Sequence, residues 1–285
     1  MNKLSLLVIT GLFLSNSLTF SDDSEFAQIL SRDGDHAGAA VEFRRLALSS
    51  NEAESRSGYF WASAYEYWKT EQFNITSKML DAAENASDKA KTPGLLLRAE
   101  STRSEKKWPE SAFYFKSLLG ADTSSDMKTY ASRGLAESSL RQNDLPSTRE
   151  ALALSPADQA KAVQALDNYE AGRDKKPALG GLLGLVPGLG YAYAGEYANA
   201  LRSVILNSLF IFGMATTAND EQWGGFAVIT FFEFTWYSGS LYGGIDASHR
   251  YNQRRLDDCV RDINGEASFS PDYERMPEVA LKFTF

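Results

Sequence analysis

The apolar residues of this chain fall into three zones with different patterns. An almost wholly apolar stretch runs from Leu4 to Leu14, and long apolar runs return between Ala178 and Ile245. Residues 22–176 instead place apolar residues at helical spacing among many Ala, Ser, Glu and Lys, with few Val or Ile and no strand-like alternation. This pattern favours helices. We therefore expect an all-α chain in which stacked helix–turn–helix repeats are followed by a two- or three-helix membrane domain.

The N-terminal zone has the organisation of a secretory signal peptide. Lys3 precedes an apolar stretch of about eleven residues, and a tail of mostly small polar residues runs to Ser21. The apolar stretch is too short to cross about 30 Å of hydrocarbon. Cleavage after Ser17 or Ser21 fits the pattern, although neither forms an Ala-x-Ala site. We predict a signal peptide over residues 1–21, with an uncleaved signal anchor as the alternative.

Residues 22–172 contain a repeated unit. Four turns with polar or glycine residues separate apolar-periodic segments, and successive turns are 37, 35 and 37 residues apart. The turns are Gly34-Asp35, Glu71-Gln72, Lys106-Lys107 and Asn143-Asp144. A period in this range indicates stacked supersecondary units that share one continuous core.

The repeated unit resembles the tetratricopeptide repeat, a pair of antiparallel helices. Its small residue in the first helix corresponds to Ala27, Ala64, Ala99 and Ala136. The bulky residue after the turn corresponds to His36, Phe73, Trp108 and Leu145, and the large apolar residue of the second helix to Phe43, Leu80, Phe115 and Leu152. The small residue usual in the second helix is kept as Ala39 but replaced by Thr76, Ser111 and Thr148. The resemblance implies stacked helical pairs with a concave surface for protein–protein interaction.

The second repeat is dense in aromatic residues. Phe60, Ala64 and Tyr67 are expected to face the core at helical spacing. Trp61, Tyr65 and Trp68 then share another face at i, i+4 and i+7. This stripe is our candidate partner-binding site, and packing against a neighbouring helix is the alternative.

Two long apolar segments follow a charged break at residues 173–177. Leu201 to Ala218 carries one charge, Arg202, and is about 27 Å long as a helix. Gly224 to Ile245 carries one charge, Glu233, and is about 33 Å long. Both fit a bilayer, so we place a membrane domain over 178–248 and a polar helix extension and tail over 249–285. A buried helical hairpin of a soluble domain is the alternative.

Glycines recur every four residues on the flanks of these segments. Small residues at this spacing allow close helix packing in lipid; they are Gly180, Gly184, Gly188, Gly239 and Gly243. The run Pro187-Gly188-Leu189-Gly190-Tyr191, followed by two apolar helices, resembles the small Pro-Gly-rich membrane domains of bacterial envelope proteins. These glycine-rich helices also offer a surface for a homo-oligomer.

The number of membrane spans stays open. If the repeat domain is exported, as the signal peptide indicates, two spans would put Arg250, Arg254 and Arg255 outside, against the positive-inside rule. Entry of residues 178–195 into the membrane, as a broken or re-entrant element, would put these arginines inside.

An acid within a membrane segment is costly and suggests a role. Glu233 is expected to pair with Arg202 or Asn207 or to be protonated.

Composition excludes several classes of function. The net charge of −8 and the absence of a basic stripe argue against a nucleic-acid partner. One cysteine, Cys259, and two histidines, His36 and His249, make a zinc site improbable. No nucleophile elbow, zinc-protease motif or dinucleotide fingerprint occurs, so we expect neither an enzyme nor a cofactor.

The expected function is that of a membrane-anchored envelope scaffold or assembly factor. Its repeat domain would be exported, on the periplasmic side in a bacterium, and would bind a protein partner, while the C-terminal domain contacts lipid; inner and outer membrane are not distinguished. The alternative is a component of a small membrane transporter or pore. The alternating segment Val279 to Phe285 resembles the last strand of outer-membrane barrels, but a free or edge-pairing tail is the expectation.

Overall fold

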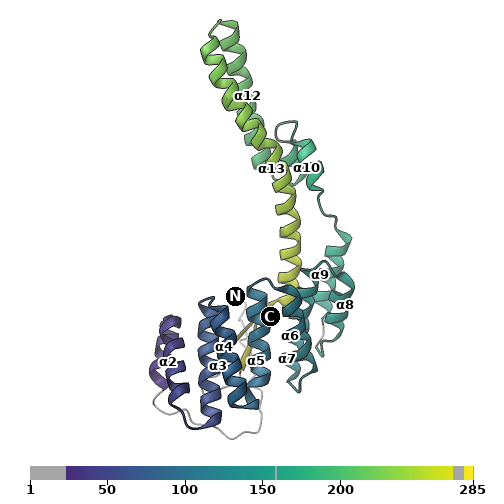
Figure 1. Cartoon of the computed structure of the whole chain (residues 1–285). Helices are drawn as coiled ribbons and strands as arrows, with labels where there is room; N and C mark the ends of the chain where they lie inside the picture. Colours follow the sequence, from purple (N-terminus) through teal and green to yellow (C-terminus); the bar gives the residue numbers. More distant parts are fainter. Residues whose placement is uncertain (1–23, 158, 272–278, 285) are drawn as a thin grey trace, which may run out of the picture. The chain divides into compact units, whose positions relative to one another are not determined.

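The computed structural model describes residues 24–157, 159–271 and 279–284, and within these the chain is helical except for one β-hairpin (Figure 1). The predicted signal peptide at residues 1–21 lies outside the described residues. The chain forms two compact units, unit 1 with residues 1–166 and 260–285, and unit 2 with residues 167–259. The divisions fall inside two helices rather than at loops.

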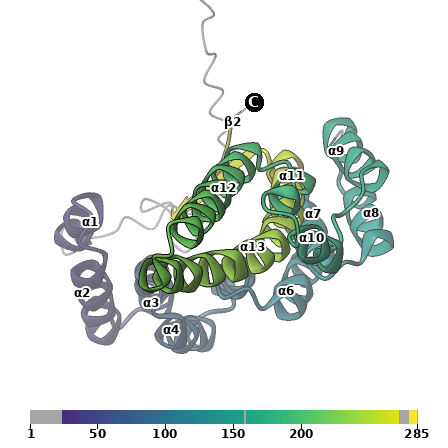
Figure 2. The ribbon, with the colours of Figure 1, turned by 90° about the horizontal axis from the view of Figure 1, so that it is seen from above.

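Unit 1 is a stack of antiparallel helical pairs, which confirms the predicted fold class. Successive pairs follow one another in sequence order (Figure 2). The pairs are α1 (Glu25–Arg32) with α2 (His36–Ser49), α3 (Ala53–Lys69) with α4 (Phe73–Ala86), α5 (Lys91–Ser104) with α6 (Trp108–Gly120), and α7 (Ser125–Leu140) with α8 (Leu145–Ala153). A short 3₁₀ helix, η2 (Asp88–Ala90), precedes α5, and α9 (Ala160–Ala171) follows α8.

All four pairs close with the same turn. Gly34, Glu71, Lys106 and Asn143 have positive φ, and these residues are the first members of the four predicted turns. In each turn the next residue donates its N–H to a carbonyl five positions back, over 2.8–3.0 Å. This is the Schellman arrangement, which satisfies carbonyls left open at a helix end. The period predicted from the sequence is therefore the period of the turns.

The residues aligned across the repeats form the core of unit 1. The four alanines of the first helices are fully buried, and the four large residues of the second helices are at most 1% exposed. Thr76, Ser111 and Thr148 are also fully buried. Their hydroxyls donate to backbone carbonyls over 3.2, 3.2 and 2.7 Å. Replacing alanine there leaves no hydroxyl without a partner, which explains why the substitutions are tolerated.

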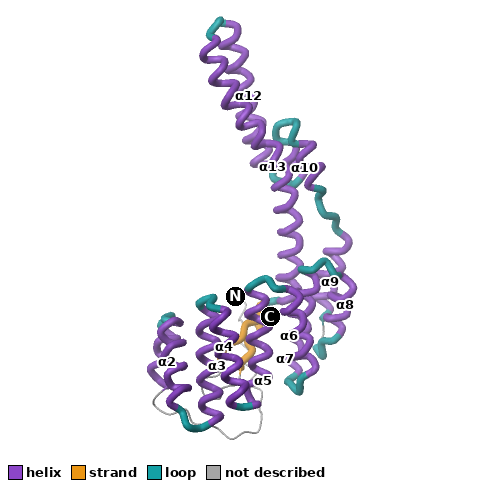
Figure 3. The backbone as a smooth tube through the Cα atoms, viewed as in Figure 1, coloured by secondary structure: helices purple, strands orange, loops and turns teal. Residues whose placement is uncertain are grey.

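A two-stranded antiparallel hairpin ends the described chain (Figure 3). Strand β1 (Glu266–Pro271) pairs with β2 (Val279–Thr284), with Glu266 opposite Thr284. The sequence pattern identified only the second strand, because β1 contains Ser, Ala and Pro rather than alternating β-branched residues. The alternating tail thus pairs with β1 of its own chain. Phe285 lies outside the described residues.

Unit 2 is built on a long helical hairpin. Its helices are α10 (Pro177–Leu183), α11 (Leu189–Tyr193), α12 (Tyr197–Asn219) and most of α13 (Trp223–Asn264). The turn at Glu221, which has positive φ, joins α12 to α13 with the same backbone hydrogen bond as the repeat turns, from Gln222 N to Thr217 O (2.8 Å). The two predicted spans lie within α12 and α13, and α13 continues as one helix beyond them to Asn264.

One helix among the described residues is long and apolar enough to cross a membrane, and it is α12. The segment Gly224 to Ile245 of α13 is not found by the same criterion. Its Trp, Tyr, Ser, Thr and Gly residues, together with Glu233, lower the mean hydropathy below that of α12.

The repeat turns allow a direct test of backbone strain. A Cβ at Gly34 would meet no atom within 4 Å, so Gly34→Ala costs only the left-handed conformation, and we expect it to lower the free energy of unfolding by about 1 kcal/mol. Lys106→Gly relieves the same conformation, and we expect it to raise that free energy by up to about 1 kcal/mol. Urea unfolding followed by tryptophan fluorescence measures both.

Gly120→Ala is the matched control, because Gly120 is helical and also has open space around its Cβ position. This change should stabilise the protein by roughly 0.5 kcal/mol. Equal effects of Gly34→Ala and Gly120→Ala would contradict the assignment of strain to the turn.

Candidate functional site

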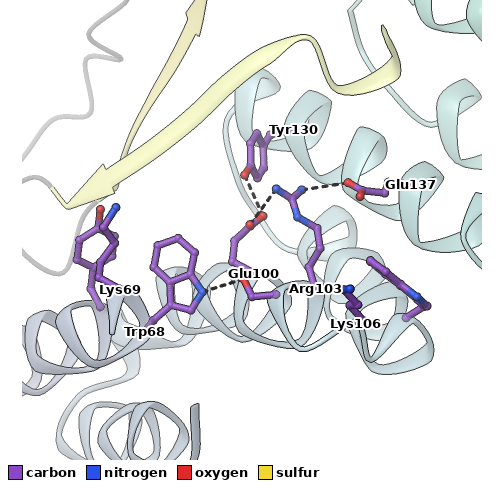
Figure 4. Close-up of a pocket in the computed structure, with 10 residues that line it drawn as sticks. Trp68, Lys69, Glu100, Arg103, Lys106, Tyr130 and Glu137 are labelled. Carbon is purple, nitrogen blue, oxygen red and sulfur yellow. Dashed lines mark hydrogen bonds and ion pairs between the residues drawn. The ribbon is translucent and has the colours of Figure 1, made fainter. Parts of the chain in front are cut away.

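Unit 1 contains a pocket of about 450 Å³ on the first helices of successive pairs (Figure 4). Side chains from α3, α5 and α7 form its floor, and the turn between α5 and α6 contributes to its rim. The lining residues are Tyr65, Trp68, Lys69, Glu100, Arg103, Ser104, Lys106, Trp108, Tyr130 and Glu137. The pocket is therefore a product of repeat stacking, since no single pair supplies it.

The main pocket residues occupy equivalent positions in the repeats. Tyr65, Glu100 and Glu137 each lie six residues before the positive-φ residue of their turn. Trp68 and Arg103 each lie three residues before it, one helical turn away from the first position. Stacking thus places these positions side by side, with Tyr65 and Trp68 on α3 next to Glu100 and Arg103 on α5. On α7 only the first position, Glu137, lines the pocket, because the second is the buried Leu140.

A buried ionic network forms the floor. The guanidinium of Arg103 lies 3.1 Å from a carboxylate oxygen of Glu100 and 3.6 Å from one of Glu137 (Figure 4). The Tyr130 hydroxyl donates to Glu100 over 2.9 Å, and Asn264 donates to Glu137 over 2.7 Å. Both carboxylates are buried, at 3% and 6% exposed. Arg103 therefore lies between two desolvated anions, and Arg141, 3.7 Å from Glu137, adds a second cation to the network.

Burial dominates the electrostatics of this network. It raises the pKa of the Glu100 carboxyl, and Arg103 and the Tyr130 hydroxyl oppose that rise. Burial by itself would lower the pKa of Arg103, but the nearby Glu100, Tyr130 and Glu137 together outweigh burial and the pKa is raised. Burial followed by the Glu100 charge raises the pKa of Tyr130. The tyrosine therefore keeps its proton and remains a donor.

The rim of the pocket is aromatic and cationic. The indole N–H of Trp68 donates to the Ser104 hydroxyl over 3.3 Å, and the Lys69 ammonium lies 5.8 Å from the centre of the Trp68 ring. The exposed residue Lys106 and the half-buried Trp108 continue the rim on the other side. The rim thus combines flat aromatic faces with ammonium groups around a charged floor.

The structure separates the three residues of the predicted aromatic stripe. Trp61 is fully buried in the core and stacks on Tyr65 at 6.0 Å between ring centres, so its prediction as a partner-binding residue is wrong. Helix α3 packs against both α2 and α4, which leaves no free face at that position. Tyr65 and Trp68 do line the pocket. Burial, and secondarily the Glu66 charge, raises the pKa of Tyr65 to about 12.

Sequence reasoning did not single out Glu100, Arg103, Tyr130 or Glu137. A signal for the two carboxylates was present, because aligning the repeat turns puts Glu100 and Glu137 at the position of Tyr65. Glu100 and Arg103 pair within α5 at i,i+3 spacing, whereas the contact of Arg103 with Glu137 joins adjacent repeats and cannot be derived from one repeat.

The predicted glycines of unit 2 lie at close contacts, with one exception. A Cβ at Gly180 or Gly184 would collide with the backbone of α13, and one at Gly188 with the backbone of α12. A Cβ at Gly243 would collide with the Tyr191 ring, whereas Gly239 has nothing within 4 Å among the described residues. Gly190 and Gly244, which the spacing did not identify, both lie against the backbone of Gly180, and neither position has room for a Cβ.

The interface between α12 and α13 is polar. The hydroxyls of Ser203 and Ser240 lie 3.1 Å apart, and Asn207 donates to the carbonyl of Ser203 over 2.6 Å. Glu233 is 9% exposed, and among the described residues its Oε2 and the Oδ1 of Asn207 have no hydrogen-bond partner. Arg202, a predicted partner of Glu233, donates instead to Asn199 over 3.3 Å.

The outward faces of the same two helices are apolar. Large side chains that are 45–71% exposed cover them, namely Leu201, Val204, Ile205, Leu209, Ile211 and Phe212 on α12 and Val228, Phe231, Phe232, Phe234 and Trp236 on α13. Unit 2 thus buries serine, asparagine and glutamate and exposes leucine and phenylalanine. This polarity is the reverse of that of a water-soluble domain.

Comparisons with protein-family models, with curated proteins and with solved structures gave no match. Among the described residues, no group of three or more His, Cys, Asp and Glu side chains is arranged to hold a metal ion. What the molecule can do is therefore argued from the pocket of unit 1 and the reversed polarity of unit 2.

The buried network gives a pH-dependent prediction. Arg103→Met leaves the buried Glu100 carboxylate without its cation and Glu137 with only Arg141, and we expect it to lower the free energy of unfolding by about 3 kcal/mol near neutral pH. Burial already raises the pKa of Glu100, and loss of the opposing Arg103 charge raises it further above the value of about 4.3 for an unfolded chain. A group with a raised folded pKa contributes its full stability below the unfolded pKa and loses it as pH rises. The destabilisation should therefore be much smaller at about pH 4.5 than at about pH 7.5.

The double variant Arg103→Met with Glu100→Gln is the control, since it removes the carboxylate charge of Glu100 that Arg103→Met leaves without a cation. It should be more stable at neutral pH than Arg103→Met alone. Urea unfolding at the two pH values measures all three proteins. A loss that is independent of pH, with no recovery in the double variant, would show that the methionine acts through packing.

Proposed function

We propose that this chain is a membrane-anchored adaptor of the cell envelope, in which the repeat array of unit 1 binds a protein partner and the α12–α13 hairpin holds the molecule in a lipid bilayer. The observation that carries the proposal is the reversed polarity of unit 2. Exposed leucine and phenylalanine on both helices, with polar residues between them, suit contact with lipid.

The dimensions of the hairpin support an anchor. The 23 residues of α12 extend about 34 Å, which exceeds the roughly 30 Å thickness of the hydrocarbon core. The tight turn at residues 220–222 carries Asp, Glu and Gln, which suits the polar side of a membrane surface. In α13, Trp223 and Trp236 are exposed, as is common near membrane interfaces.

The pocket supports a partner-binding role for unit 1. It lies on equivalent positions of stacked repeats, and its resemblance to tetratricopeptide arrays implies recognition of a polypeptide segment. Trp68, Trp108 and Lys106 offer the aromatic and cationic contacts that contribute strongly to protein interfaces. The signal peptide predicted from the sequence supports an exported location for this unit, and that location is part of the proposal.

A component of a small membrane transporter or pore is the second candidate function. Glu233 and Asn207 favour it, because each leaves an acceptor oxygen without a partner between the hairpin helices. Ionisable residues within membrane segments commonly mark ion or proton pathways. Reconstituted vesicles test this function: Glu233→Gln should abolish an ion or proton flux if the pathway exists.

The anchor is tested by fractionation. We expect the full chain to stay with the membrane pellet after alkaline carbonate extraction and to be released by detergent, because the exposed apolar faces of α12 and α13 must remain in lipid. Recovery in the soluble fraction without detergent would refute the anchor.

Partner binding is tested by cross-linking capture with variants of the rim. Trp68→Ala combined with Lys106→Ala should reduce capture of a specific partner about tenfold or more, since it removes one aromatic and one charged contact. Phe113→Ala is the matched control, because Phe113 is 65% exposed on α6 and does not line the pocket. Circular dichroism establishes that both proteins are folded. Equal capture by the two variants would exclude the pocket as the binding site.

A further inference from the structure

The segment of residues 177–195, with helices α10 and α11, has an unusual distribution of side chains. Its glycines Gly180, Gly184, Gly188 and Gly190 are buried, and so is Ala194. Its large aliphatic residues point outward, with Leu179, Leu182, Leu185, Val186 and Leu189 between 38% and 62% exposed. In water such a segment would bury its leucines and expose its glycines.

Specific contacts hold this orientation in place. The backbone of Gly180 lies so close to Gly244 of α13 that neither position has room for a Cβ. The Tyr237 hydroxyl of α13 donates to the carbonyl of Leu185 over 2.7 Å, and so fixes the turn between α10 and α11. Rotation of the segment to bury its leucines would lose both contacts. The exposed aliphatic face is therefore built into the packing of unit 2.

The irregular backbone of the segment indicates whether the segment would lie in the core of a membrane or at its surface. Helices α10 and α11 have only seven and five residues, and the chain between them at residues 184–188 is irregular. Lipid-exposed irregular backbone does not occur within the hydrocarbon region, because polar groups there lack partners. The boundary between headgroups and acyl chains accepts both the aliphatic side chains and the broken backbone.

Polar anchors flank the segment where an interface would require them. The Lys175 ammonium lies 4.7 Å from the centre of the Tyr193 ring and 5.3 Å from that of Tyr251. The carboxylate of Glu196, directly before α12, accepts hydrogen bonds from Arg250 over 2.9 and 2.8 Å. The Arg250 hydrogen bonds lower the pKa of Glu196, so this ion pair persists near neutral pH. Lysine, arginine and tyrosine are typical of membrane interfaces.

We propose that residues 179–189 form an interfacial wedge, with the exposed leucines and Val186 inserted at the headgroup–acyl boundary of one leaflet beside the α12–α13 hairpin. The occupant of this aliphatic face is lipid. The exposed apolar surface of α12 and α13 supports that choice, because the wedge is joined to both helices by the glycine and tyrosine contacts. The inference rests on the membrane anchor of the proposed function and adds a second, shallow contact to it.

Depth-dependent quenching tests the wedge in the full chain. In a Cys259→Ser background, a single cysteine replaces Leu182, Leu185, Leu209 or Phe113 and carries an environment-sensitive fluorophore. The protein is reconstituted into phosphatidylcholine vesicles with bromine near either the headgroup end or the methyl end of the acyl chains. Leu182 and Leu185 serve as independent sites on the wedge, Leu209 marks the middle of α12, and Phe113 marks the surface of unit 1.

We expect the labels at Leu182 and Leu185 to be quenched about twofold more by shallow than by deep bromine, because interfacial segments insert about 5–10 Å into this boundary. The label at Leu209 should show the opposite preference, and the label at Phe113 should respond to neither.

Each other outcome overturns the wedge in a distinguishable way. The wedge is refuted, and the anchor is not, if bromine quenches the label at Leu209 while the labels at Leu182 and Leu185 are quenched only by aqueous iodide. Protection of the wedge labels from both bromine and iodide shows that a second copy covers the face. Deep quenching at all three sites shows a membrane-crossing segment. Absence of quenching at Leu209 refutes the anchor itself.

Discussion

Close approach of helices through small residues is the constraint on which both units depend. In unit 1 the fully buried alanines at positions 27, 64, 99 and 136 allow the helices to pack and leave the large residues of the second helices to fill the remaining space. In unit 2, Gly180 and Gly244 bring α10 into backbone contact with α13. Dispersion contacts weaken steeply as a gap opens. A larger side chain at these points would therefore displace whole helices, and the pocket and the proposed wedge would both lose their geometry.

The same stacking concentrates charge where water is excluded. Adjacent repeats bring Glu100 and Glu137 to one cation, Arg103, under a rim of tryptophan and lysine. A buried network of this kind contributes little net stability compared with apolar packing. Its effect is to fix the register of α5 against α7, because misalignment would leave a carboxylate unpaired.

The two units bury opposite kinds of side chain, although both are built from similar helical hairpins. Unit 1 buries alanine, leucine and aromatic residues, whereas unit 2 buries serine, asparagine and glycine between helices that expose leucine and phenylalanine. The hairpin turn at Glu221 has the same left-handed residue and backbone hydrogen bond as the repeat turns. Backbone geometry therefore does not distinguish the units. The units differ in which side chains face outward, and the lipid contact proposed for unit 2 would account for that difference.

The sequence by itself determined the helical class, the repeat period and the long apolar helices, because these depend on local periodicity and turn chemistry. The turns at Gly34, Glu71, Lys106 and Asn143 fall where the alignment put them. Only the tertiary structure decided that Trp61 belongs to the core while Trp68 reaches the pocket, since burial depends on neighbouring helices. It also decided the pairing of Arg103 with Glu137 of the next repeat and that of β1 with β2. Contacts between residues far apart in the chain carry no signature in the spacing of either partner, so they become visible only once the chain is folded.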